Sequence, residues 1–241
     1  MKYALLSDVH GNLEAFEAVL KEIEKKSPEE ILFLGDIVGY GANPNQSIEL
    51  LKSITDTALA GNHDHAAAGL MDITCFNPYA KEAILWTQNC LTSDHLVYLK
   101  RLPYVLSKEE MTLVHASPKE PEQWHYLSGT GSIGNNFDCF DTRLCFIGHT
   151  HIPLVIIEEK GEVTSSSETR IEIEESKRYM INIGSVGQPR DGNNQAAYAI
   201  YDTKEGVIEI HRTSYDIRRA KEKIIKEGIP AYLADRLDYG R

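Results

Sequence analysis

The stretch Tyr3-Ala4-Leu5-Leu6-Ser7-Asp8-Val9-His10-Gly11-Asn12 sets the pattern on which the rest of this sequence builds. Residues 3–6 form a short apolar run that predicts a buried strand, and Asp8 and His10 follow directly where that strand ends. Apolar residues then recur at helical spacing over residues 13–23. The unit is a strand, a polar loop and an amphipathic helix. In open α/β sheets, such loops gather in the crevice beyond the carboxyl ends of the strands.

The same unit is repeated downstream. Apolar runs at residues 31–34 and 57–60 predict two more strands, and a helical pattern covers residues 45–52 between them. This β-α-β-α-β order is typical of parallel strands joined by helical crossovers. Asp36 follows the second predicted strand, and residues 62–64 follow the third. We therefore expect these polar residues to meet Asp8 and His10 at one edge of a sheet.

The later part of the chain changes character. Helical patterns occupy residues 79–90 and 93–102, and two more lie at residues 216–226 and 231–237. Short strands are predicted at residues 104–106, 111–114, 144–147, 154–157, 179–183, 197–201 and 207–211, which indicates a second, more antiparallel sheet. His115 follows the second of these strands, and His149 and His151 follow the third.

The organisation of the chain favours one domain over residues 1–241, because nothing resembling a flexible linker divides it. The charged, serine-rich residues 158–177 predict a surface hairpin. Residues 116–141 lie between two strands that end in histidines, and they contain Trp124 and Tyr126. This segment is predicted either to form a lid over a substrate or to bury its aromatic residues on the body. Within it, residues 129–134 match a dinucleotide-binding GxGxxG pattern, but no convincing strand precedes them.

The net charge and the cysteines indicate which partners and which cellular compartment suit the protein. The formal net charge of −11 disfavours general binding to nucleic acid or to anionic membranes. A bound metal pair would reverse that sign locally, so a small phosphate ester remains a suitable substrate. The four cysteines lack metal-binding or redox spacing, which favours reduced thiols in a cytoplasm. No apolar run approaches the length of a membrane span, and no secretory leader pattern precedes the first strand.

The polar residues after the predicted strands have the composition of a metal site. The candidate ligands are Asp8, His10, Asp36, Asn62, His115, His149 and His151. Two cations a few ångströms apart can neutralise a phosphoester while one of them delivers hydroxide. Such a pair needs a shared carboxylate, and Asp36 is the candidate bridge because the glycine beside it permits close approach. The mixed nitrogen and oxygen donors suit two divalent ions of manganese, iron, cobalt, nickel or zinc better than calcium or magnesium.

Five short motifs contain these residues: Asp8-Val9-His10, Gly35-Asp36, Gly61-Asn62-His63-Asp64, Val114-His115 and Gly148-His149-Thr150-His151. In this order they resemble the calcineurin-like metallophosphoesterase superfamily, specifically its compact bacterial and archaeal phosphodiesterase branch. The stretch at residues 182–190 is also similar to that branch. The resemblance implies an α/β fold, a four-layer αββα sandwich of two mixed β-sheets flanked by helices. It implies one metal bound by Asp8, His10, Asp36 and His151, and a second bound by Asp36, Asn62, His115 and His149.

The resemblance also implies catalytic roles. His63 would protonate the leaving oxygen, with Asp64 orienting its ring, and a metal-bridging hydroxide would be the nucleophile. A positioned general acid contributes roughly 10²–10⁴-fold to such a reaction. Asn12 and Arg190 are candidate substrate contacts; the alternatives are a helix cap for Asn12 and an ordinary arginine paired with Asp191 for Arg190.

Phosphodiester hydrolysis is the favoured function on this sequence. Hydrolysis of nucleotide polyphosphates or phosphomonoesters is an alternative within the same chemistry. A nuclease is disfavoured, because a polymeric substrate benefits from a positive track that the composition does not show. A different class is a non-catalytic, partner-binding scaffold, as the retromer subunit of this fold is; His63 and the full apparent ligand set favour catalysis.

Overall fold

The computed structural model describes residues 1–127 and 133–241. Most of the glycine-rich pattern at residues 129–134, and the middle of the predicted lid segment 116–141, lie outside the described residues. The α-helices are α1 (Leu13–Lys26), α2 (Pro44–Ile54), α3 (Asn62–Ala67), α4 (Pro78–Cys90), α5 (Ser93–Arg101), α7 (Ile217–Lys226) and α8 (Ala231–Asp235). Three short 3-10 helices are η1 (Pro121–Gln123), η2 (Gly134–Cys139) and η3 (Arg236–Asp238).

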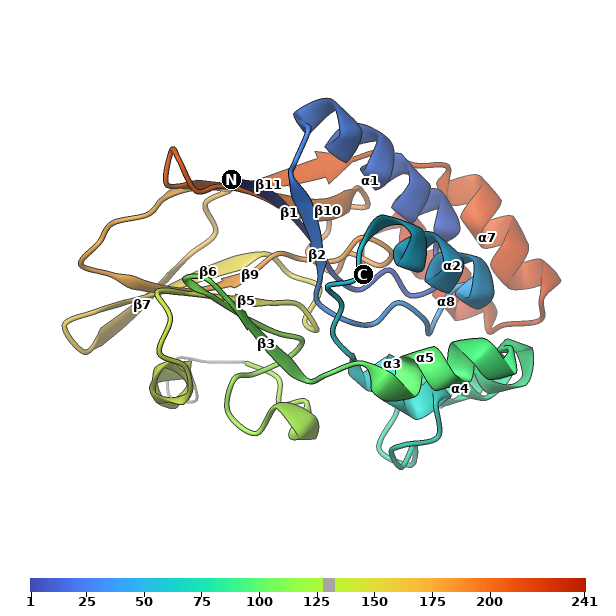
Figure 1. Ribbon diagram of the computed structural model, residues 1–241. Coiled ribbons are helices and arrows are strands. Elements are labelled where there is room, and N and C mark those ends of the chain that lie inside the picture. The colour runs from blue at the N-terminus through green and yellow to red at the C-terminus, as the bar shows by residue number, and fades with distance from the viewer. Residues whose placement is uncertain (128–132) are drawn as a thin grey trace.

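The strands form two mixed sheets, both visible in Figure 1. The strands are β1 (Lys2–Leu6), β2 (Glu30–Phe33), β3 (Val105–Lys108), β4 (Met111–Val114), β5 (Leu144–Ile147), β6 (Leu154–Glu159), β7 (Glu162–Ser166), β8 (Arg170–Glu172), β9 (Arg178–Asn182), β10 (Ala196–Asp202) and β11 (Val207–Thr213). The five-stranded sheet has the order β2-β1-β10-β11-β8, and the six-stranded sheet has the order β3-β4-β5-β9-β6-β7.

Alternation along β1 shows how the layers are built. Tyr3 and Leu5 point toward the other sheet, whereas Ala4 and Leu6 point toward the helices. On the helical side, α1 contributes Phe16 to a buried cluster that also includes residues of α2. Figure 1 shows α1 against the sheet that contains β1, β10 and β11, with α7 lying beside α1. A strand with opposite faces on two apolar layers is buried completely, which explains why residues 3–6 have no polar member.

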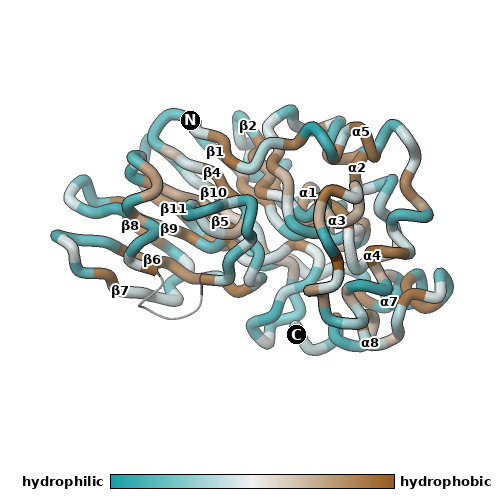
Figure 2. The backbone as a smooth tube through the Cα atoms, turned by 90° about the horizontal axis from the view of Figure 1, so that it is seen from below, coloured by the Kyte–Doolittle hydropathy of each residue, from teal (hydrophilic) through white to brown (hydrophobic). Residues whose placement is uncertain are grey.

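The outer face of the six-stranded sheet is covered differently. Leu127, Ile133, Phe137 and Phe140 pack there against side chains of β5, so η2 and its flanks form this layer. Apolar stretches of the chain gather along the interior strands, and hydrophilic stretches lie in the outer turns near β7 and β8 (Figure 2). The two mixed sheets and their helical layers confirm the predicted fold class.

Three sequence expectations are wrong in part. The late strands do not form one separate sheet, because β10 pairs antiparallel with β1 and brings β11 and β8 into the first sheet. Residues 57–60 form no strand; one isolated bridge joins Ala58 to Phe33. Residues 158–177 form no single hairpin, because β6 and β7 pair with each other while β8 joins the other sheet. Local patterns indicate strands, but pairing between distant strands decides their sheet.

The parallel strands position the polar loops. β1 pairs parallel with β2, and β5 pairs parallel with both β4 and β9. Main-chain hydrogen bonds then join the loops that follow these strands: Asp8 N donates to Gly35 O, and Gly148 N donates to His115 O. The loops after β1, β2, β4 and β5 therefore meet at one edge of the molecule. Among the described residues, no helix is long and apolar enough to cross a lipid bilayer.

Candidate metal centre

The first ligand cluster lies between the loops after β1 and β5. The Nε2 atom of His151 is 3.1 Å from Asp8 Oδ1 and 3.0 Å from His10 Nε2. His10 Nε2 is 3.7 Å from the same Asp8 oxygen. The ligand atoms of these three buried residues all lie within 4.8 Å of one another, which is close enough for one cation to contact all of them.

The second cluster is formed by Asp36, His115 and His149, whose ligand atoms also lie within 4.8 Å of one another. Asp36 Oδ2 is 3.3 Å from His115 Nε2 and 3.6 Å from His10 Nε2. Asp36 is therefore in reach of both clusters, as a bridging carboxylate must be. Asn62 begins helix α3 and, with His149, lines a cleft beside this second cluster.

Several buried ligand atoms have no hydrogen-bond partner within the described residues. They are Asp8 Oδ1, Asn62 Oδ1, His115 Nε2 and His149 Nε2. An unpaired buried polar atom costs about 1–3 kcal/mol, and more if it is charged, so such atoms rarely gather without a reason. Two cations would bind all four. The residues present thus fit the pair of divalent ions that the sequence predicts.

Main-chain carbonyl groups fix the orientation of three imidazoles. The Nδ1 atom of His10 lies 3.1 Å from Val38 O, that of His115 lies 2.8 Å from Leu34 O, and that of His151 lies 2.5 Å from Gln188 O. Each carbonyl accepts a hydrogen bond from Nδ1–H, so in the neutral ring the lone pair is on Nε2. All three Nε2 atoms point into the ligand clusters.

The ligand loops have a strained backbone. Asp8, His10, Asp36, His149 and His151 all have positive φ, between 53° and 66°. This left-handed conformation costs a non-glycine residue roughly 1–2 kcal/mol. Strain of this kind persists only where the surrounding structure enforces it, and it clusters at functional sites. Here it turns consecutive side chains of tight loops toward the same point.

Two glycines allow the loops to approach this closely. A Cβ atom at Gly61 would lie 2.0 Å from Asp36 Oδ1, and one at Gly39 would lie 2.6 Å from His10 Nδ1. Gly39 also has φ of 140°, which a side chain rarely permits. Any side chain at either position would displace a ligand.

The surroundings of the two acidic candidate ligands favour their ionised forms. Burial opposes the charge of Asp8, but His151, His115 and His10 outweigh it and hold the pKa of Asp8 well below its usual range. Burial is likewise outweighed at Asp36, where His115 and His63 lower the pKa of the carboxyl. Burial disfavours the charged form of His115, but Asp36 and Asp8 prevail and raise its pKa to about 9.

Two further candidate ligands, His149 and His151, favour the neutral form. Burial, followed by the charge of His115, lowers the pKa of His149 to about 3. Burial, followed by the charge of Arg190, lowers the pKa of His151 to about 3. Neutral imidazoles are ready to bind a cation, whereas His115 must first release its proton. Metal binding should therefore strengthen as the pH rises toward 9.

The structure corrects the role that the sequence suggested for Asp64. Its carboxylate accepts hydrogen bonds from the main-chain N–H groups of Asp36, Val38 and Gly61, and none from the His63 ring. His63 Nδ1 is buried without a partner in the described chain. Burial and then the charge of Asp36 raise the pKa of Asp64 to about 7, against the N–H groups that lower it. Asp64 thus holds the loop of Asp36 in place and does not orient His63.

Replacing Asp64 by alanine should destabilise the fold. The change leaves three main-chain N–H groups without their acceptor, and each unsatisfied buried donor costs about 1–3 kcal/mol. We expect a loss of about 3 kcal/mol or more in the free energy of unfolding, measured by urea denaturation. Asp138→Ala, at an exposed position, is the control and should change it by less than about 0.5 kcal/mol. Equal stability of the two variants would contradict this role.

His63 is buried and lines the cleft beside the second cluster. Its ring is 4.5 Å from that of Tyr40, 4.7 Å from that of His10 and 5.1 Å from that of Phe76, measured between centroids. A ring nitrogen of His63 also lies within 4.8 Å of ligand atoms of His10 and Asp36. Burial lowers the pKa of His63 well below its usual value, with Asp36 opposing that effect. His63 can therefore reach both the clusters and a molecule in the cleft.

The two predicted substrate contacts differ in their surroundings. Asn12 is buried; its Oδ1 accepts from Ala15 N at the start of α1, and its Nδ2 donates to Gly187 O. Both ends of this amide are committed within the fold, which favours the helix-cap interpretation. Arg190 does not pair with Asp191, which instead pairs with Arg212. Arg190 Nη2 donates to Gln188 Oε1 at 2.8 Å and to the Tyr40 hydroxyl at 3.3 Å.

A cleft of about 430 Å³ opens beside the second cluster. Asn62, His63 and His149 line this cleft together with Tyr40, Met71, Cys75, Phe76, Asn77, Ala80, Gln123, Trp124 and Tyr126. The sequence did not indicate Tyr40 or Phe76, because a single aromatic residue in a loop resembles any core residue. The Gly39-Tyr40 step after the Asp36 loop was the only local signal.

The predicted lid segment contributes to this cleft from one side. Trp124 is buried, and its ring centroid is 5.8 Å from that of His115. Tyr126 is 57% exposed, and its ring centroid is 4.1 Å from that of His149. One aromatic residue thus packs on the body, as the alternative interpretation expects, while the other stands at the mouth of the site. Whether the segment moves as a lid stays a prediction.

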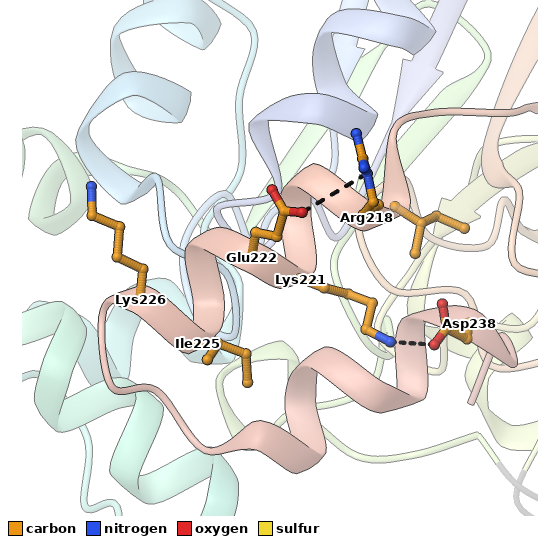
Figure 3. Close-up of a pocket in the computed structure, with 7 residues that line it drawn as sticks. Arg218, Lys221, Glu222, Ile225, Lys226 and Asp238 are labelled. Carbon is orange, nitrogen blue, oxygen red and sulfur yellow. Dashed lines mark hydrogen bonds and ion pairs between the residues drawn. The ribbon is translucent and has the colours of Figure 1, made fainter.

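A second hollow of about 520 Å³ lies on the surface of α7 (Figure 3). Ile217 and Ile225 contribute its apolar part. The charged residues there pair with one another, Arg218 with Glu222 and Lys221 with Asp238, as the dashed lines in Figure 3 mark. No ligand cluster of the described residues lies at this hollow. The chemistry-bearing groups are concentrated in the first cleft.

Known proteins are similar to this chain in sequence and in architecture. A sequence model of the calcineurin-like phosphoesterase superfamily domain matches residues 1–206. An uncharacterized protein of Methanocaldococcus jannaschii is 43% identical over 242 residues, which cover 99% of this chain and 98% of that protein. The crystal structure of a metallophosphoesterase from Sphaerobacter thermophilus is 39% identical, with a TM-score of 0.90 over 100% of this chain and 99% of that one. Phosphodiesterase YfcE of Escherichia coli is 24% identical over 208 residues, 84% of this chain and 88% of that protein.

Proposed function

The chain belongs to the calcineurin-like phosphoesterase superfamily, and on that premise we propose that it hydrolyses phosphodiesters with the help of two divalent metal ions. One observation carries the proposal: two clusters of buried ligand atoms, one around Asp8 and one around Asp36, with Asp36 in reach of both. Within the described residues, no protein group forms a hydrogen bond with the unpaired ligand atoms of these clusters. A pair of adjacent cation sites suits phosphoester hydrolysis.

The chemistry divides between the ions and the chain. When bound, the two ions would neutralise the phosphate and activate water for attack. The side chain of His63 would hold the leaving oxygen and donate a proton to it, since it lines the cleft beside Asn62 and His149. The negative charge of a bound phosphate would favour the protonated form of His63 and oppose the effect of burial. Arg190 is proposed to bind a phosphate oxygen.

The donor set supports a transition metal. Nitrogen donors from four histidines accompany two carboxylates and one amide oxygen in the proposed ligand set, a mixture that suits manganese, iron, cobalt, nickel or zinc. We propose manganese as the first ion to test. Calcium and magnesium prefer sites made of oxygen alone.

The choice of a diester rests on two supports. The cleft beside the clusters has room and apolar lining for an organic group on the leaving oxygen. The relative YfcE is a phosphodiesterase, and it is similar over most of this chain. Hydrolysis of phosphomonoesters or nucleotide polyphosphates uses the same ions and remains an alternative to be separated by a substrate panel. A non-catalytic scaffold would have no use for an open cleft that ends at His63.

We also propose a binding partner and a cellular location, from the net charge and the cysteines. The net charge of −11 favours a small phosphate ester over nucleic acid or an anionic membrane surface. The four cysteines are unpaired, which supports a reducing cytoplasm.

The test combines metal analysis with turnover. Protein of measured metal content is assayed with bis(p-nitrophenyl) phosphate and with p-nitrophenyl phosphate, as purified, after chelation, and after addition of manganese, zinc or nickel. We expect faster hydrolysis of the diester, loss of activity on chelation, and recovery with at least one ion. Protein that binds two ions yet hydrolyses no ester under any condition would refute the proposal and favour the scaffold.

Metal binding should also stabilise the fold. An ion that binds only the folded chain, at 100 times its dissociation constant, adds about 2.7 kcal/mol to the free energy of unfolding. We therefore expect the urea midpoint to rise when manganese is added to chelated protein. The Asp56→Asn variant, altered at an exposed aspartate, is the control and should show the same rise. An unchanged midpoint would argue against buried cation sites.

A further inference from the structure

We propose that Arg190 and Arg236 form a second anion-binding subsite beside the metal centre, and that it binds a second phosphate of the substrate. The substrate class is thus a phosphate ester or anhydride that carries another phosphate next to the scissile one. This inference rests on the proposed function and extends it. Nothing in the sequence pattern points to Arg236, which lies near the end of the chain in η3.

Both guanidinium groups lie against the same aromatic ring. The Cζ atom of Arg190 is 5.6 Å from the centroid of Tyr40, and that of Arg236 is 6.0 Å from it. The Tyr40 ring in turn lies 4.6 Å from the ring of His10 and 4.5 Å from that of His63. One buried ring therefore separates both cations from the proposed reacting groups. Through the Tyr40 ring, both cations therefore lie beside His10 and His63 of the proposed metal centre.

Among residues 1–127 and 133–241, neither arginine forms an ion pair with an Asp or Glu side chain. The side chain of Arg190 donates only to the neutral acceptors Gln188 and Tyr40. Arg236 donates from Nε to the main-chain oxygen of Arg241, and its guanidinium also lies 5.6 Å from the ring of Tyr232. Other arginines of this acidic chain do find carboxylates; Arg212, for example, pairs with Asp191.

Two half-buried, like charges near one another are unfavourable unless an anion joins them. Burial, and next the charge of Arg190, lowers the pKa of Arg236, whereas burial at Arg190 is outweighed by Tyr40 and Tyr126, which raise the pKa of Arg190. The chain has 36 acidic residues against 25 Lys and Arg residues, so carboxylates were available to neutralise both. Because no Asp or Glu side chain pairs with either arginine, the N–H donors that Gln188, Tyr40 and Arg241 do not engage can bind a ligand. Arginine binds phosphate oxygens through two parallel N–H donors, which gives both affinity and direction.

The charges of the whole site point the same way. Two divalent ions exceed the charge of the ionised Asp8 and Asp36, and the two arginines add further positive charge. A simple diester brings a single negative charge and leaves much of this excess unbalanced. A second phosphate on the substrate would balance it. The site is therefore better matched to a doubly phosphorylated substrate than to the plain diester used as a test compound.

The test compares substrates that differ only in the second phosphate. One pair is thymidine 5′-(p-nitrophenyl phosphate) and the same compound phosphorylated at the 3′ position; a dinucleoside polyphosphate supplies the anhydride arm. We expect the wild-type protein to prefer at least one doubly phosphorylated compound by kcat/KM. The arm that shows the preference distinguishes a phosphorylated ester from an anhydride.

Arg236→Gln should reduce that preference roughly tenfold to hundredfold, mainly through KM, because it removes a charge-assisted hydrogen bond. Arg236→Lys keeps the positive charge but loses the two parallel N–H donors, so it should reduce the preference less. Arg218→Gln is the matched control, since Arg218 is exposed and paired with Glu222 on α7, and it should leave the preference unchanged. An equal loss on both members of the pair, or no change in Arg236→Gln, would overturn the proposal.

A binding measurement tests the subsite independently of catalysis. Calorimetry compares adenosine α,β-methylene diphosphate with AMP, on wild-type protein and on Arg236→Gln. We expect wild-type protein to bind the diphosphate more tightly and the variant to lose most of that difference. If the protein hydrolyses no substrate but still binds the diphosphate more tightly than AMP, the proposed function is refuted and the subsite is kept. If it hydrolyses the diesters but shows no such binding difference, only the subsite is refuted.

Discussion

Replacing Asp36 by asparagine is expected to reduce the occupancy of both metal positions together and to lower turnover by about 10³-fold or more. Asp36 Oδ2 lies between His115 and His10, one from each cluster, so its charge serves both cations. Metal ions contribute several kcal/mol of charge stabilisation to such a transition state, and each 1.4 kcal/mol corresponds to about tenfold in rate. Asparagine keeps the shape of the side chain but loses the charge that holds two cations side by side.

The measurement is metal content by elemental analysis, together with kcat/KM on bis(p-nitrophenyl) phosphate. Asp56→Asn makes the same chemical change at an exposed site and should retain both ions and full activity. Asp36 also accepts a hydrogen bond from His63 N through Oδ1, which asparagine can preserve with its own oxygen, so the fold should survive. Retention of one ion with loss of the other would show that Asp36 serves a single site.

His63→Ala should keep both ions and reduce turnover by roughly 10²–10⁴-fold on a diester with an alkoxide leaving group. An alkoxide leaves poorly without a proton, whereas p-nitrophenolate is stable as an anion. The loss should therefore be much smaller on the nitrophenyl ester. This dependence on the leaving group is the signature of a proton donor, and a merely structural histidine would not produce it.

The same variant tests the main alternative for this residue. A ring nitrogen of His63 lies close enough to ligand atoms of His10 and Asp36 to act as a metal ligand. Metal loss in His63→Ala equal to that in Asp36→Asn would make His63 a ligand and end its assignment as the general acid. His211→Ala, on β11, removes a histidine outside the clusters and is the control for changes in overall stability.

The candidate ligands were accessible from the sequence because all of them except Asn62 follow an apolar strand. Burial on both faces makes such strands easy to identify, as residues 3–6 show. The sheet arrangement was less accessible. Local pattern identified the segment that became β10, but its antiparallel pairing with β1 depends on residues almost 200 positions away. Asp64 was misjudged for a related reason, since its partners are main-chain groups that sequence does not display.

Sequence alone determined the type of chemistry in this protein: acids, imidazoles and an amide placed at strand ends, in the order of a phosphoesterase family. It did so because ligand identity and strand burial are local properties, written in residue types and their spacing. Only the tertiary structure decided which candidate ligand atoms lie within reach of one cation, that Asp64 supports the Asp36 loop, and that Arg236 approaches Tyr40. Those relations depend on side chains that meet across loops, where distance along the chain carries no information about distance in space.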